Sequence, residues 1–278
     1  MLYLLLAILS STMVTVLMRV GSRGEARKPL LAVNYVTCVA VSLLFLRGGA
    51  SPGAEGWPVA LGLGVAGGFL FLAAFLLFQK NVRDNGVALS SAFMKLGVIV
   101  PIVLGFTLFR EPLRLTLAAG IVLTAAAILL LSRDPAGRQP GRLSALVLLL
   151  LMGGMADGLG KFYAAYGSPR LEGHYLLLVF GTALLLCVGL CALQRQKPTP
   201  RDGLYGVLLG IPNYFSSWFL LRALASVPAS VAYPVFSCGT ILLVTLIGIL
   251  AFNERPDRRQ RIAMGIVLAA LALLNAAP

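Results

Sequence analysis

Charged residues are scarce in this chain of 278 residues: Asp, Glu, Lys and Arg together make up 12% of it, about half of the roughly 25% that is usual in soluble domains. Hydrophobic residues make up 59%, and the mean hydropathy is +0.91. This composition excludes an ordinary soluble fold, because too few polar side chains are available to cover a surface in water. The chain is predicted to be an integral membrane protein.

Side chains that commonly perform catalysis or bind metals are also rare. Intramembrane aspartyl proteolysis needs two acids, but the apolar segments contain one, Asp157. Ser/His hydrolysis needs a buried imidazole, but the single histidine, His174, lies at the edge of such a segment. The cysteines all lie within apolar segments, at Cys38, Cys187, Cys191 and Cys238. Since they lack the partners of a metal site, they are interpreted as packing residues, and we expect no enzyme, no catalytic residue, no metal and no cofactor.

What the sequence does contain is long apolar runs. A helix needs about 20 apolar residues to cross a bilayer. Ten runs of approximately this length can be marked, at residues 2–18, 30–46, 57–78, 86–109, 115–132, 143–165, 174–193, 203–221, 229–252 and 262–277. The first run lacks the basic n-region and the cleavage site of a signal peptide, so we expect it to be a retained helix. The fold class is predicted to be an all-α membrane protein with ten transmembrane helices.

The placement of basic residues predicts the orientation of these helices. The formal net charge is +13, which could suggest nucleic-acid binding. However, 16 of the 23 Lys and Arg residues lie in odd-numbered connections between the runs, and five lie in even-numbered ones. This asymmetry is the ordinary sign of membrane topology, with the odd connections facing the cytoplasm. We expect a multi-pass protein of a bacterial-type inner membrane, with both termini outside and no nucleic-acid partner.

The chain contains an internal repeat. Residues 87–123 and 230–268 each carry Phe-x-Glu at the end of a long apolar run, with the glutamates at Glu111 and Glu254, 143 positions apart. A short basic connector and a run that opens with Gly-Ile-Val-Leu follow in both copies. We therefore divide the chain into two five-helix repeats, 1–137 and 138–278, which form one membrane unit. Because five is odd, the second copy enters the membrane in the opposite direction.

Together, these features resemble the EamA-type branch of the drug/metabolite transporter superfamily. The resemblance covers essentially the whole chain and rests on the ten runs, the 5+5 duplication and the Glu-Pro and Glu-Arg-Pro connectors after the fourth and ninth runs. It implies a basket of ten helices, a central cavity lined mainly by the first, third, fourth, sixth, eighth and ninth runs, and export or exchange of small metabolites. It assigns no substrate to this chain.

Charges within the runs are the first candidate site residues. Lys95 lies in the fourth run, Asp157 and Lys161 lie in the sixth, and Arg19 closes the first. Such side chains are costly in a bilayer and should face the bundle interior or water. Asp157 and Lys161 have the i,i+4 spacing of a helical ion pair, which either satisfies itself or lines the cavity. Lys95 needs a partner from another helix or from a ligand.

Polar and aromatic residues beside helix-interrupting prolines are the second set of candidates, since interrupted helices flank the site in many transporters. The set comprises Asn213, Tyr214 and Trp218 after Pro212, Tyr233 before Pro234, and the similar dipeptide Asn34 and Tyr35 in the second run. Asn34 has a second interpretation, as a residue that holds two helices together.

These observations favour a secondary transporter that works by alternating access, because a site between inverted halves can open to either side. The mid-run charges sum to +1, or +2 with Arg19, which favours an anionic or zwitterionic small molecule. The alternative is a non-transporting membrane scaffold or a component of a lipid-carrier flippase. As partners we expect the small-molecule substrate and the lipid bilayer, and we expect a monomer or weak homodimer.

The predicted topology can be tested with a reporter that is active only outside the inner membrane. Fused to either terminus it should be active, and inserted in the connection at residues 194–202 it should be inactive. The reverse pattern would contradict the orientation derived from the basic residues.

Overall fold

A computed structural model of the chain describes residues 1–22, 28–46, 54–85, 87–110, 115–132, 143–252 and 258–275. These residues are almost entirely helical, and no strand occurs among them. The helices are α1 Leu2–Ser22, α2 Lys28–Leu44, α3 Trp57–Asn85, α4 Val87–Leu96, α5 Ile99–Thr107, α6 Leu115–Ser132, α7 Leu143–Tyr166, α8 Glu172–Leu193, α9 Pro200–Leu224, α10 Ala229–Phe252 and α11 Arg258–Asn275, with a 3-10 turn, η1, at Pro169–Leu171.

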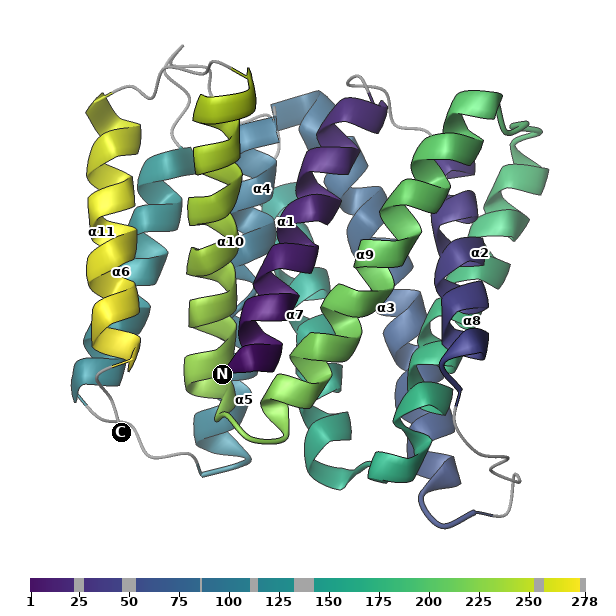
Figure 1. Ribbon diagram of the computed structural model, residues 1–278, viewed down its shortest axis with the longest axis horizontal. Coiled ribbons are helices and arrows are strands. Elements are labelled where there is room, and N and C mark those ends of the chain that lie inside the picture. The colour runs from purple at the N-terminus through teal and green to yellow at the C-terminus, as the bar shows by residue number, and fades with distance from the viewer. Residues whose placement is uncertain are drawn as a thin grey trace.

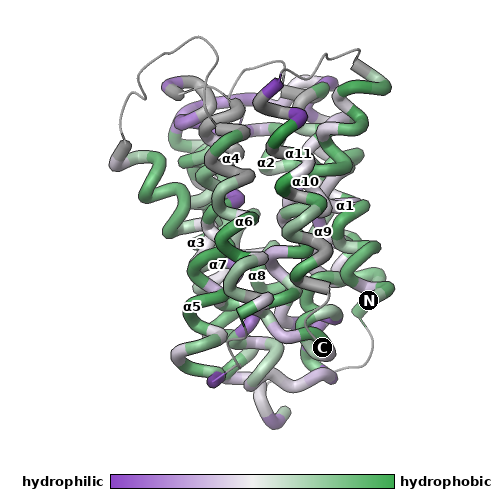
Figure 2. The backbone as a smooth tube through the Cα atoms, turned by 90° about the vertical axis from the view of Figure 1, so that its left-hand side faces the viewer, coloured by the Kyte–Doolittle hydropathy of each residue, from purple (hydrophilic) through white to green (hydrophobic). Residues whose placement is uncertain are grey.

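The predicted fold class is confirmed: the protein is an all-α membrane protein built from two inverted five-helix repeats. Five of the described helices are long and apolar enough to cross a membrane, by length and composition, and shorter apolar helices occupy Leu2–Met18, Lys28–Leu44 and Phe93–Thr107. Figure 2 shows hydrophobic residues along the length of the helices, whereas hydrophilic residues gather toward the two ends of the bundle. This distribution fits a bundle with its helix axes across a bilayer.

The helices pack in a pattern that is nearly unchanged when the two repeats are exchanged. The first repeat contributes α1 to α6 and the second α7 to α11, so that α4 and α5 together correspond to α10. α3 packs on α7 and α8, and its counterpart α9 packs on α1 and α2. The pairs α2·α8 and α6·α11 are their own counterparts, and they lie on opposite sides of the bundle, at the right and left of Figure 1. α1 begins and α11 ends toward the same face, called here the terminal face, at the lower side of Figure 1.

The fourth predicted run differs from the expectation of a single helix, because it is broken between α4 and α5 at Gly97 and Val98. Proline has no N–H, and its ring collides with the carbonyl four residues earlier. For Pro101 that carbonyl belongs to Gly97, whose oxygen instead accepts a tighter bond from Val100 N at 2.9 Å. Gly97 N and Val98 N likewise donate to the carbonyls three residues back, at Met94 and Lys95. Pro101 therefore explains where the helix breaks.

The break lies directly against a glycine of α7. A Cβ added at Gly154 would lie 2.3 Å from the carbonyl oxygen of Gly97, far inside normal contact. A Cβ added at Gly97 would in turn lie 2.9 Å from the backbone nitrogen of Gly154. The two backbones can approach this closely only because both residues lack side chains.

GxxxG spacing occurs at Gly64 and Gly68 on α3 and at Gly206 and Gly210 on α9, and each of these pairs faces a packed helix. A Cβ at Gly68 would lie 2.4 Å from Val179 O on α8, and one at Gly210 would lie 2.5 Å from Thr37 Cβ on α2. These two contacts are counterparts under exchange of the repeats, since α3·α8 corresponds to α9·α2. Glycine thus brings the helices together at equivalent places in both halves.

Substituting Gly154→Ala should lower the free energy of unfolding by about 1–3 kcal/mol, the usual range for overpacking, measured by denaturant unfolding in mixed micelles. Gly189→Ala on α8 is the matched control, because a Cβ there meets nothing within 4 Å, and alanine favours a helix more than glycine does. Equal stability of the two variants would show that the Gly97 and Gly154 backbones are not in close contact.

Candidate functional site

The charged residues predicted in the middle of the runs gather where the two repeats meet. Lys95 lies in the last turn of α4, just before the break, and Asp157 lies on α7, one turn after Gly154. Their charges interact electrostatically across the α4·α7 contact. Both residues are intermediate in burial. Lys95 therefore finds its partner on another helix, in the opposite repeat.

α10 closes this cluster from a third direction. Tyr233 Oη donates a hydrogen bond to the backbone carbonyl of Asp157, and the Phe236 ring lies under Lys95, with its centroid 5.1 Å from Nζ. Tyr175 of α8 interacts electrostatically with Asp157 as well. Since ring faces attract cations, Phe236 helps to hold the Lys95 ammonium in place. We call Lys95, Asp157, Tyr233 and Phe236 the central cluster.

Lys161 faces a different environment from the one that its spacing to Asp157 suggested. Its Nζ lies 5.0 Å from the centroid of the Phe109 ring, just past the end of α5. Phe109 in turn packs against Phe162 and Tyr166 of α7, at centroid distances of 5.3 and 5.9 Å. The charge that acts on Asp157 from another helix is that of Lys95. The i,i+4 pair of Asp157 with Lys161 stays a prediction.

The polar residues of the second and eighth runs form a separate cluster between α2 and α9. Asn213 Nδ2 donates to Asn34 Oδ1 at 3.2 Å, and Cys38 Sγ contacts Gly210 O at 3.3 Å. This contact across the α2·α9 interface fits the interpretation of Asn34 as a residue that joins helices. Nevertheless, Asn34 Nδ2 and Tyr35 Oη are buried without a hydrogen-bond partner among the residues that the structure describes. Orphaned groups of this kind are costly, so packing alone does not account for the cluster.

Tyr214 and Trp218 extend from this cluster toward the terminal face. Tyr214 is buried, and its ring lies 6.1 Å from that of Phe180. The guanidinium of Arg222 lies over the ring of Trp218, with Cζ 5.3 Å from the ring centroid. Arg222 Nε pairs with Glu172 at 2.8 Å, which links α9 to the start of α8. This ion pair could not be predicted from the sequence, because Glu172 and Arg222 are 50 positions apart and only the folded chain brings them together.

The candidate residues therefore fall into three places. Lys95, Asp157 and Tyr233 belong to the central cluster, and Lys161 lies beside the aromatic residues near it. Asn34, Tyr35, Asn213 and Tyr214 form the α2·α9 cluster, and Trp218 accompanies Arg222. The side chain of Arg19 lies outside the described part of the structure.

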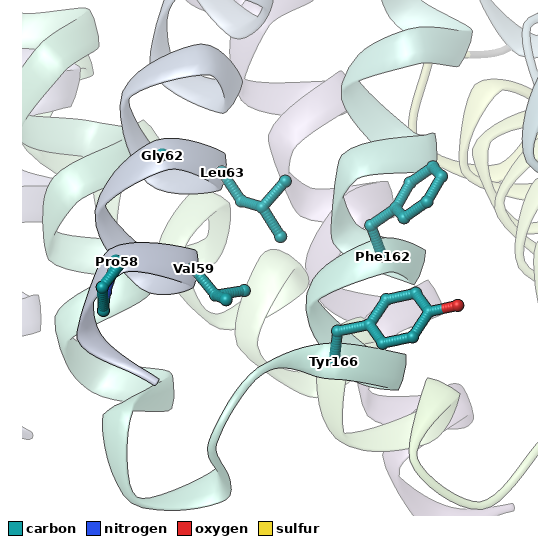
Figure 3. Close-up of a pocket in the computed structure, with 6 residues that line it drawn as sticks. All are labelled: Pro58, Val59, Gly62, Leu63, Phe162 and Tyr166. Atoms are coloured by element: carbon teal, nitrogen blue, oxygen red, sulfur yellow. The ribbon is translucent and has the colours of Figure 1, made fainter. Parts of the chain in front are cut away.

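A pocket of about 340 Å³ opens between α3 and α7 near the terminal face (Figure 3). Its lining is almost entirely apolar and comprises Pro58, Val59, Gly62, Leu63, Phe162 and Tyr166. It contains none of the residues predicted to bind a substrate. Its walls nevertheless include Phe162 and Tyr166, which pack on the ring that Lys161 covers.

An apolar bundle of inverted repeats with a charged cluster between them defines a membrane transporter. Comparison with known families is consistent with this class, because the model of the EamA-like transporter family matches residues 1–133 and 143–276. The chain belongs to this family, which confirms the resemblance drawn from its repeat and connectors.

Known relatives add the fold but no substrate. An uncharacterized protein of Haemophilus influenzae is 26% identical over 287 aligned positions, which cover 98% of this chain and 96% of that protein. YvaE, an uncharacterized membrane protein of Bacillus subtilis, is 38% identical over 60 residues, which are 22% of this chain and 50% of YvaE. One crystal structure superposes on this chain with a TM-score of 0.77 at 18% identity. The superposition covers 99% of this chain and 96% of the chain in that structure.

The pairing of Lys95 with Asp157 predicts strong coupling in a double-mutant cycle. Lys95→Met or Asp157→Asn alone should destabilise the protein by up to roughly 3–5 kcal/mol, because each leaves an uncompensated charge, and the double variant should recover part of this loss. The unfolding free energy in mixed micelles is the measurement. A parallel cycle of Lys161→Met with Asp157→Asn should show the smaller coupling; if it shows the larger, the helical i,i+4 pair is the true one.

Proposed function

We propose that the protein is a secondary transporter that exports or exchanges a small metabolite by alternating access across an inner membrane. The substrate is bound at the central cluster, between the two repeats. Family membership supports membrane transport in general, and we further propose the site, the charge of the substrate and the mechanism.

The proposal rests on the opposite charges at the centre, which attract each other across the contact between the two repeats. Lys95 comes from the first repeat, and Asp157 comes from the second. Inverted repeats can rock against each other around a fixed site near the middle of the membrane. A ligand that competes for either member of the pair therefore acts on the contact between the two halves, as a transported substrate must.

The charges in this region favour an anionic or zwitterionic substrate. Lys95 on α4 lies across from one acid, Asp157 on α7. A carboxylate or phosphate of the substrate can replace Asp157 as the partner of Lys95, while a substrate amine can pair with the released Asp157. A cation without an anionic group would offer Lys95 no such partner and would be repelled by it.

Aromatic groups around the cluster suit an organic substrate rather than a bare inorganic anion. Phe236 lies against the Lys95 ammonium, and the Tyr233 hydroxyl already bonds to the Asp157 backbone. Rings at these positions can contact the apolar part of a metabolite whose charged groups engage Lys95 and Asp157.

Thermal unfolding of the purified protein against anionic, zwitterionic and cationic metabolites tests the proposal. A ligand that binds only the folded state stabilises it by about 2.7 kcal/mol at 100 times its Kd. We expect anionic or zwitterionic compounds to raise Tm and to lose this effect in Lys95→Ala. Lys197→Ala, which removes an exposed lysine, should respond as the wild type does.

Two results would contradict the proposal. Stabilisation by cations alone would overturn the charge argument. A panel without any effect would favour the alternative of a non-transporting scaffold or a component of a lipid-carrier flippase.

A further inference from the structure

The apolar groove between α3 and α7 has no part in the proposed transport. Figure 3 shows Val59 and Leu63 pointing from α3 toward α7, with Phe162 and Tyr166 on the opposite wall. Pro58, Gly62 and Tyr166 are exposed, so the groove opens onto the outside of the two helices. A surface of this kind on a membrane-spanning bundle faces lipid chains.

The groove lies at the level of a membrane interface. α3 begins at Trp57, and α7 ends at Tyr166, so both helices reach the terminal face at the groove. Trp and Tyr are enriched at this depth, where a lipid head group meets its chains. A chain that enters the groove therefore has its head group just beyond the ends of α3 and α7.

Two exposed arginines lie next to that position. Arg110 directly follows Phe109, whose ring packs on both Phe162 and Tyr166 in the groove wall. Arg170 belongs to the turn η1, which continues from α7. This turn packs against the start of α3, since a Cβ added at Gly56 would lie 3.2 Å from Ser168 Cβ. Both arginines thus belong to segments that pack against the helices of the groove at its lower end.

These arginines are unusual for the face on which they lie. The connections on the terminal face contain five basic residues, against 16 in those on the opposite face. Arg110 has a backbone φ of 51° just past the end of α5, the left-handed conformation in which many helices end.

We propose that this groove binds one acyl chain of an anionic phospholipid from the leaflet at the terminal face, whose phosphate is held by Arg110 and Arg170. The apolar lining selects a chain, and the two cations select a negative head group over a zwitterionic one. This lipid is a bound partner of the transporter, separate from the substrate of the central cluster.

The test compares lipids that share their chains and differ in head group. Purified protein is titrated in detergent with dioleoyl phosphatidylglycerol or dioleoyl phosphatidylcholine, and binding is followed by the rise in Tm. We expect the anionic lipid to raise Tm more at equal concentration. Arg110→Gln and Arg170→Gln should each weaken its binding about fivefold, the usual contribution of a basic residue near an anionic lipid surface.

Matched variants separate this site from general charge and packing effects. Arg195→Gln is the control for charge, because Arg195 is exposed on the opposite face and has a similar φ of 52°. Gly62→Leu should fill the groove and abolish the lipid effect, since a Cβ at Gly62 meets nothing within 4 Å. Gly181→Leu on α8, which is equally open, should leave the lipid effect unchanged.

Several outcomes would overturn the proposal. Equal stabilisation by the two lipids in the wild type would exclude head-group selection. An undiminished response in Gly62→Leu, or an equal loss in Arg195→Gln, would place the lipid elsewhere. Because Lys95→Ala should keep the lipid response, failure of this proposal can be distinguished from failure of the proposed transport function.

Discussion

The close contact between the Gly97 carbonyl and Gly154 is the constraint on which the centre of this protein depends. Pro101 prevents a regular helix at this point and leaves the carbonyl without its usual partner. The absence of a side chain at Gly154 lets α7 come up against the break. Lys95, two residues before Gly97, then lies across from Asp157, three residues after Gly154. A structural glycine thus sets the register of a charged site.

Much of this arrangement could be predicted from the sequence, because it follows from local rules. Apolar runs located the helices, and the Phe-x-Glu repeat predicted the inverted halves, since both signals depend only on the order of residues. Lys95, Asp157 and Tyr233 were identified as candidates because charges and interrupted helices are rare inside membranes. The helix break could not be predicted from Pro101 and Gly97 alone, because a proline in a membrane helix can either kink it or break it.

The sequence could not predict which residues of different helices meet in three dimensions. The i,i+4 rule pointed to Lys161 for Asp157, and it could not show that the contact of α4 with α7 also brings the charge of Lys95 to bear on Asp157. Likewise, the pair of Glu172 with Arg222 and the groove at Gly62 depend on how α8 meets α9 and how α3 meets α7. A one-dimensional pattern constrains which helix face a residue occupies, but not which neighbour that face meets.

The packing of the helices matches under exchange of the repeats, but their side chains do not. At the offset of 143 residues that relates Glu111 to Glu254, Lys95 corresponds to Cys238, a neutral thiol packed against Thr124 at 3.3 Å. The attraction between Lys95 and Asp157 therefore has no mirror image in the other half. If the two halves trade conformations during transport, this attraction contributes to any difference in energy between the two resulting states. A substrate offsets that contribution only if it binds the less favoured state more tightly than the other.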